Sequence, residues 1–89
     1  MQDEEIKNIL INDFGFEGKL LNHLIMQSLE VAGFREAITR NTKGEFETSF
    51  LGKKGIGKYP AYAMKNLWLE IYNDPDLKEK LRNNKKDQS

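Results

Sequence analysis

The segment at residues 60–73 constrains the fold of this chain more than any other. It begins with Pro60 and is apolar through most of its length, at Ala61, Ala63, Met64, Leu67, Trp68, Leu69 and Ile71. Proline is favoured at the first position of a helix, and a helix with so few polar positions must be buried. The chain has 89 residues and no cysteine, so disulfides cannot stabilise it. We therefore expect one domain with a core, including Trp68, built around a central helix here.

Two further helices are expected before this segment. Asp3 is suited to cap a first helix that ends by Asp13. A second helix is expected from Glu17 to Ala32, with an apolar stripe at Leu21, Leu24, Ile25, Ser28, Leu29 and Ala32. Gly33 predicts a left-handed C-terminal cap, after which Phe34 folds back onto the helix. The short linker at residues 14–16 is expected to pack against the domain.

A β-hairpin is expected between the second helix and the central one. Residues 35–40 and 45–51 flank the tetrad Asn41-Thr42-Lys43-Gly44, which suits a type I turn followed by a left-handed glycine. In this register Arg40 faces Phe46, Ile38 faces Thr48 and Glu36 faces Phe50. The phenylalanines then share one face of the hairpin, and a slip of one residue would scatter them.

A last short helix is expected to start at Asp74-Pro75, with Leu77 and Leu81 on its apolar side. The polar tail at residues 83–89 has nothing to bury and is expected to be disordered. The expected fold class is therefore α+β. One globular domain spans residues 1–82, with the element order α-α-β-β-α-α and one antiparallel β-hairpin packed against helices.

The stretch GKKGIGKY at residues 52–59 lies between the hairpin and the central helix, where a loop is expected. At Gly52, Gly57 and Lys58 it resembles the Walker A motif of P-loop nucleotide-binding proteins, whose backbone amides wrap phosphates. Tyr59 stands where that family has the serine or threonine that holds magnesium, and the preceding strand belongs to a hairpin instead of a βαβ unit. We therefore expect no nucleotide hydrolysis and no cofactor.

The same loop could still hold an anion. Its glycines let the backbone approach a ligand closely, its lysines supply charge, and the positive end of the central helix lies beside it. Because polymer phosphates need no magnesium, this reasoning predicts contact with DNA or RNA, with tyrosines stacking on bases. The predicted nucleic-acid-binding residues are Lys53, Lys54, Gly55, Gly57, Lys58, Tyr59, Tyr62 and Lys65. The alternative is a solvated loop whose lysines serve only solubility.

Residues 18–73 are also similar in element order to part of a double-stranded-RNA-binding domain. That order is a helix, a hairpin, a lysine-bearing loop and a helix. The resemblance implies phosphate contacts from lysines at the start of the last helix. This chain departs from the pattern because only two strands are readable, the family's Gly-Pro-His loop is absent, and Tyr59-Pro60 occupies the place of a lysine pair.

The charges are unevenly distributed although 14 basic and 14 acidic residues balance. Acids dominate residues 1–17, whereas residues 48–69 contain lysines and no acid. Such polarity favours an oriented partner. The alternative function is therefore a protein-interaction or inhibitor module, similar to accessory proteins of phages and mobile elements that mask a surface of a host protein. The stripe of Ile6, Ile9 and Leu10 on the first helix could instead pair two copies into a homodimer.

Catalysis, metal binding and membrane insertion find no support in the sequence. His23 is the single histidine and no cysteine accompanies it, which leaves no zinc ligand set. No serine lies in a nucleophile-elbow context, so an enzyme is not expected. The acidic start and the lack of a long apolar run argue against a secretory signal and a membrane span, so a cytoplasmic location is the expectation.

Overall fold

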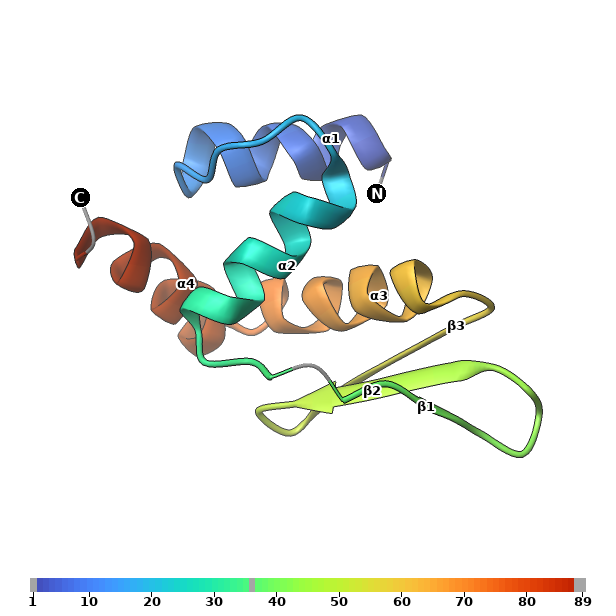
Figure 1. The fold of residues 1–89 in the computed structure, drawn as a ribbon. Coiled ribbons are helices and arrows are strands. Elements are labelled where there is room, and N and C mark those ends of the chain that lie inside the picture. Colours follow the sequence, from blue (N-terminus) through green and yellow to red (C-terminus); the bar gives the residue numbers. More distant parts are fainter. Residues whose placement is uncertain (1, 36, 88–89) are drawn as a thin grey trace.

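Helix α3 (Pro60–Tyr72) forms the centre of the fold, as its composition predicts (Figure 1). The computed structural model describes residues 2–35 and 37–87, with side chains as far as residue 82. Leu67, Trp68 and Ile71 are fully buried, so the predicted core role of Trp68 is confirmed. The α+β fold class is also confirmed. The helix lies between a three-stranded sheet on one side and helix α2 (Leu21–Val31) on the other.

The sheet is antiparallel with strand order β1-β2-β3, formed by β1 (Thr39–Arg40), β2 (Phe46–Phe50) and β3 (Lys53–Gly57). Arg40 pairs with Phe46 and Thr39 with Glu47, which confirms the predicted hairpin register. Gly44 has a φ of 81° and its N–H donates to the Asn41 carbonyl, as the predicted turn requires. The first strand is shorter than the predicted 35–40, and the predicted pairing of Glu36 falls on a residue outside those that the structure describes.

The third strand corrects the prediction for the glycine–lysine segment. Residues 53–57 do not form a loop, because each of them pairs with a residue of β2, from Phe50 opposite Lys53 to Phe46 opposite Gly57. Lys53, Gly55 and Gly57 share one face of this strand, while Lys54 and Ile56 share the other. The predicted element order α-α-β-β-α-α therefore lacks one strand, β3.

The turn between β2 and β3 consists of only Leu51 and Gly52, with φ angles of 52° and 79°. Two positive φ angles are the requirement of a type I′ turn, for which asparagine followed by glycine is preferred. Leucine is strained in this region because its Cβ crowds the backbone. We expect Leu51→Asn to stabilise the domain by about 0.5–1 kcal/mol and to raise the melting temperature by about 4 °C, measured by circular dichroism. No change, or a decrease, would contradict the strain assigned to Leu51.

The N-terminal helical region lies across α2 (Figure 1) and consists of α1 (Asp3–Asn8) continued by the π-helical segment η1 (Ile9–Asp13). Asp3 lies inside the first turn and Gln2 precedes the helix, so the prediction that Asp3 caps it is wrong. Ile6 and Leu10 are fully buried in the domain's own core. Two of the three residues of the predicted dimer stripe are therefore not accessible to a second copy, and the homodimer itself stays a prediction.

The linker and the second helix pack largely as predicted. Phe14 and Phe16 are buried in the core. Helix α2 begins at Leu21 instead of Glu17, because Leu20 is extended and Gly18 has a φ of 155°. Its end is confirmed as a Schellman motif: the N–H of Phe34 donates to the Leu29 carbonyl at 2.8 Å, after Gly33 with a φ of 102°.

Helix α4 (Pro75–Asp87) begins where Asp74-Pro75 predicts. The Asp74 carboxylate accepts hydrogen bonds from the N–H groups of Asp76 and Leu77, at 3.0 and 3.3 Å. Leu81 is fully buried. The helical backbone continues to Asp87, and residues 88–89 lie outside the described part of the chain. The disorder that the sequence predicts for residues 83–89 stays a prediction.

The Asp74 cap predicts a specific pH dependence. The hydrogen bond from the Leu77 N–H, with those from Asp76 and Lys53, lowers the pKa of Asp74 below its ordinary value of 3.8. A carboxyl with a lowered folded-state pKa stabilises the fold above its unfolded pKa, and this contribution is lost as the pH falls through the folded value. We expect the wild type to lose more stability than Asp74→Asn between neutral pH and pH values below 3.8. Thermal melts of both proteins across this range measure the difference, and parallel curves would contradict the cap's role.

Candidate interaction surface

Three of the predicted phosphate-binding lysines are paired with carboxylates of the same chain. Lys53 lies 3.5 Å from Asp74, and Lys54 lies 2.8 Å from Glu47. Lys65 lies 2.7 Å from Asp3, in the acidic N-terminal region. Exposed pairs of this kind contribute only about 0–1 kcal/mol to stability, but they reduce the positive potential that a polyanion would meet.

Two of the three glycines of the predicted loop, Gly55 and Gly57, serve packing against α3. A Cβ on Gly55 would overlap the Ala63 carbonyl oxygen and the Leu67 backbone nitrogen, and a Cβ on Gly57 would lie 2.6 Å from the Tyr62 Cβ. Their lack of a side chain lets β3 approach the helix closely. The backbone around Gly55 is therefore covered by α3, and the prediction that it faces outward toward an anion is wrong.

The remaining predicted residues are exposed at the start of α3. Lys58 is exposed, and Tyr59 and Tyr62 retain 60% and 50% of their accessible surface. The two tyrosine rings contact each other with centroids 5.6 Å apart. The Lys65 ammonium lies 5.7 Å from the Tyr62 ring centre. Of the eight predicted residues, the structure thus places Lys58, Tyr59 and Tyr62 next to one another on an exposed surface.

Leu20 joins the two tyrosines and is not among the site residues that the sequence predicts. It is 72% exposed, the largest value among the exposed large hydrophobic residues that the structure describes. A shallow hollow connects it with Tyr59 and Tyr62, and is also lined by Asp3, Leu21, Asn22, His23 and Ala61. Leu20, Tyr59 and Tyr62 together form an apolar patch.

Two members of the apolar patch occupy helix N-cap positions. Leu20 precedes α2 and Tyr59 precedes α3, and neither side chain makes a capping hydrogen bond. Serine, threonine, aspartate or asparagine at an N-cap stabilises a helix by about 0.5–2 kcal/mol relative to an apolar residue. Leu20 and Tyr59 therefore leave their helices less stable than a capping residue would, and each places an apolar side chain in solvent. This is the sequence signal by which Leu20 could have been found.

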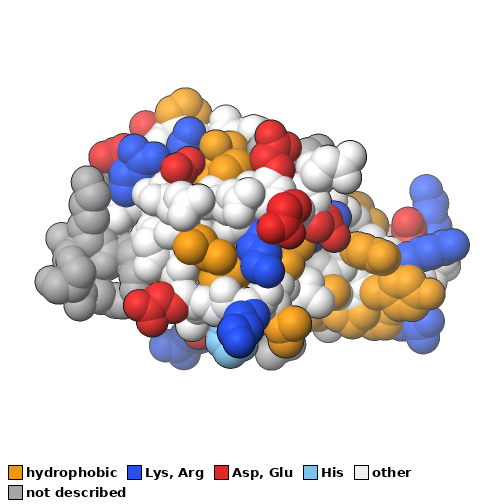
Figure 2. All heavy atoms as spheres, turned by 90° about the horizontal axis from the view of Figure 1, so that it is seen from above, with side chains coloured by type: hydrophobic (Ala, Val, Ile, Leu, Met, Phe, Trp, Pro, Cys, Tyr) orange, Lys and Arg blue, Asp and Glu red, His pale blue; other side chains and the backbone are white. Residues whose placement is uncertain are grey.

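A second feature is the group of cations at the hairpin end of the sheet. Gly57, Phe46 and Arg40 lie side by side in the strand register, so Lys58 lies next to the turn that holds Lys43. Arg40 stacks on the Phe46 ring at 5.2 Å, and none of these three cations takes part in the ion pairs of the described residues. Figure 2 shows basic and apolar side chains together at this end.

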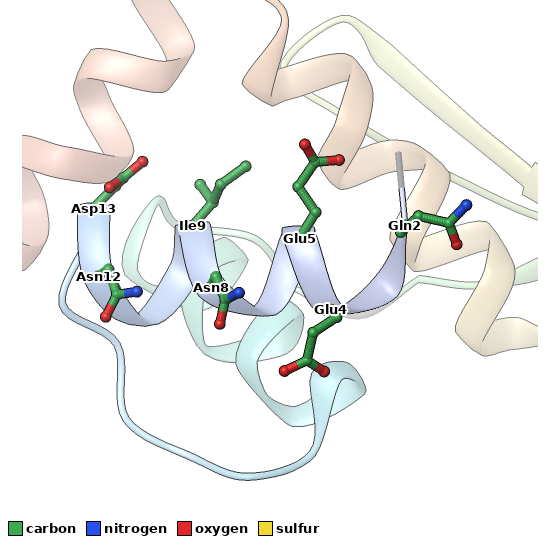
Figure 3. Close-up of a pocket in the computed structure, with 7 residues that line it drawn as sticks. All are labelled: Gln2, Glu4, Glu5, Asn8, Ile9, Asn12 and Asp13. Atoms are coloured by element: carbon green, nitrogen blue, oxygen red, sulfur yellow. The ribbon is translucent and has the colours of Figure 1, made fainter.

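The outer side of α1 and η1 forms a third feature, an acidic hollow (Figure 3). Figure 3 shows Glu5, Ile9 and Asp13 following one another along one side of the helix, with Glu4 nearby. The complete lining is Gln2, Glu4, Glu5, Asn8, Ile9, Asn12 and Asp13. Ile9 is half-buried, while Glu4, Glu5 and Asp13 are exposed. The hollow thus presents one apolar side chain between carboxylates.

Other kinds of site have less support. Among the residues that the structure describes, no group of three or more His, Cys, Asp or Glu side chains could hold a metal ion, and His23 is exposed on α2. Within the same residues, no helix combines the length and apolar character needed to cross a membrane.

Comparison with known proteins gives no match. No family model matches the chain, and neither curated proteins nor solved structures yield a match. The third strand removes one departure from the element order of the double-stranded-RNA-binding domain, since α2, the three strands and α3 now follow one another. Tyr59-Pro60 still stands in place of the lysine pair, so the likeness rests on element order alone.

Proposed function

We propose that this chain is a non-enzymatic protein-interaction module that recognises its partner through the apolar patch. The observation that carries this proposal is the convergence of Leu20 and Tyr59, two apolar N-caps from different helices, with Tyr62 on one hollow. A protein keeps features that lower its own stability mainly where they serve function.

The composition of the patch favours a protein partner. Tyrosine is among the residues that contribute most to binding at the centres of protein interfaces. Its ring buries a large apolar area, and its hydroxyl group can still find a hydrogen-bond partner. The pairing of Lys53, Lys54 and Lys65 with carboxylates of the same chain disfavours phosphate recognition by β3. The alternative from the sequence, an interaction or inhibitor module, is therefore the better supported of the two.

Photo-crosslinking tests the proposal without knowledge of the partner. Tyr59 is replaced by the photoreactive aromatic residue p-benzoylphenylalanine, and a matched control carries it at Lys80, which is exposed on α4. After irradiation in a lysate of the source cells and nuclease treatment, we expect one protein adduct from position 59 and none from position 80. An adduct with nucleic acid, or equal labelling from both positions, would contradict the proposal.

Nucleic-acid contact is a second candidate because Arg40, Lys43 and Lys58 lie outside the ion pairs described. Binding through them would be electrostatic and would weaken steeply with salt, since lysine contacts with phosphates release counterions. Titration of labelled duplex and single-stranded oligonucleotides at low salt tests this candidate. Binding that is lost in Lys43→Glu/Lys58→Glu and retained in Lys80→Glu would favour it over the protein partner.

A further inference from the structure

We propose that the surface recognised by the apolar patch is the acidic hollow of a second copy of this chain, so that two copies form a two-fold dimer. This inference rests on the proposed function and specifies its partner. It differs from the dimer predicted by the sequence, because Ile9 is the one stripe residue that it uses, together with carboxylates on the outer side of the first helix.

The two surfaces have opposite charges beside exposed or half-buried apolar side chains. Lys19 and Lys58, both exposed, are the chain neighbours of Leu20 and Tyr59, and Asp3, the carboxylate that lines the hollow of the apolar patch, is paired with Lys65. In the acidic hollow, Ile9 lies between Glu5 and Asp13 (Figure 3). Exposed apolar side chains with lysines next to them in the chain would therefore meet a half-buried apolar side chain that lies between carboxylates. Electrostatic complementarity of this kind sets the orientation of partners.

The positions of the two surfaces allow a closed dimer. Asp3 lines the hollow of the apolar patch and binds Lys65, while its neighbours Gln2 and Glu4 line the acidic hollow. The surfaces thus meet at the first turn of α1. In a two-fold dimer the same contact is made twice, patch to hollow and hollow to patch, which requires both surfaces on adjoining parts of one face.

The overall charge does not oppose this association. The chain carries 14 basic and 14 acidic side chains, so two copies do not repel each other through net charge. A net charge near zero favours association of like molecules. The dimer would then explain the uneven distribution of acidic and basic residues, since the acidic region of each copy pairs with the basic region of the other.

Charge reversal on either surface gives a sharp test by sedimentation equilibrium. One variant carries Glu5→Lys and Asp13→Lys, the other carries Lys19→Glu and Lys58→Glu, and all four positions are exposed. We expect the wild type to dimerise with a Kd in about the micromolar range, and each variant alone to bind itself at least about 10-fold more weakly at low salt.

A one-to-one mixture of the two variants provides the decisive result. One variant is positive at both surfaces and the other is negative at both, so each contact in a mixed dimer joins opposite charges. We expect the mixture to form heterodimers at least as tightly as the wild type, with the advantage fading at about 0.5 M salt. A control with Glu79→Lys and Lys80→Glu on α4, both exposed, should behave as the wild type.

The inference fails if the wild type stays monomeric up to about 1 mM. It also fails if the mixture associates no more tightly than each variant alone. The proposed function is tested separately by the crosslink from position 59. A protein adduct of different mass from this chain, together with a monomeric wild type, would overturn the dimer and leave the interaction module standing. An adduct of two copies of the chain supports both.

Discussion

Replacing Gly55 by alanine is expected to unfold the domain or to leave it only marginally stable. The added Cβ would lie 2.8 Å from the Leu67 Cβ and would overlap the Ala63 carbonyl oxygen and the Leu67 backbone nitrogen. Backbone atoms of a buried helix cannot move aside as a flexible side chain can. Relief requires β3 to separate from α3, which exposes the apolar face between them. Overpacking of a core costs about 1–3 kcal/mol and more where the backbone must shift, so we expect a loss of at least about 3 kcal/mol.

The measurement is urea unfolding followed by circular dichroism, with Gly52→Ala as the control. Gly52 has a φ of 79°, and a Cβ added there would meet no heavy atom within 4 Å, so its substitution carries only backbone strain of about 1–2 kcal/mol. For a domain of this size, the loss at Gly55 corresponds to a decrease of about 12–24 °C in melting temperature. If Gly55→Ala is no more destabilising than Gly52→Ala, β3 does not lie against α3 as described. An anion-binding loop would then again explain why these positions are glycine.

Removing the two tyrosine rings is expected to abolish partner binding without loss of stability. In Tyr59→Ser/Tyr62→Gln the serine can cap α3, and the glutamine three residues later completes a capping box. This variant is therefore expected to melt no lower than the wild type. Truncation of a tyrosine at an interface centre costs about 2 kcal/mol or more, so we expect a loss of affinity of at least about 100-fold for the pair. A fall in both stability and binding would leave the role of the rings in recognition unsupported.

Much of the fold is predictable because its signals are local. The apolar composition of residues 60–73, the glycine after α2 and the Asn41–Gly44 turn each act through neighbouring residues. These signals correctly predict the central helix, the Schellman motif and the hairpin register.

The third strand is not predictable in the same way. Its lysines and glycines have low strand propensity, and its turn places Leu51 at a φ of 52° where a glycine or asparagine is usual. What makes residues 53–57 a strand is contact with β2 and α3, which no local pattern encodes. Gly57, which fits a phosphate-binding motif, therefore also fits close helix packing, and only tertiary structure separates the two explanations.

The sequence predicts the candidate surface only in part. Lys58, Tyr59 and Tyr62 are expected together as neighbours of a basic loop, and they are exposed together. Leu20 lies 39 positions before Tyr59 in the numbering, and only the packing of α2 on α3 brings it to the same hollow. The missing capping residues at both helix starts are the one local signal that points to the two positions.

The most direct test of recognition by the apolar patch compares two variants in one assay of partner protein retained by the tagged chain. Tyr59→Ser/Tyr62→Gln removes the rings and leaves the lysines of β3, whereas Lys53→Gln/Lys54→Gln removes two lysines and leaves the rings. We predict that the tyrosine variant retains about one hundredth of the partner at limiting concentration, and that the lysine variant retains nearly as much as the wild type. Full retention by the tyrosine variant, with loss in the lysine variant, would contradict the account.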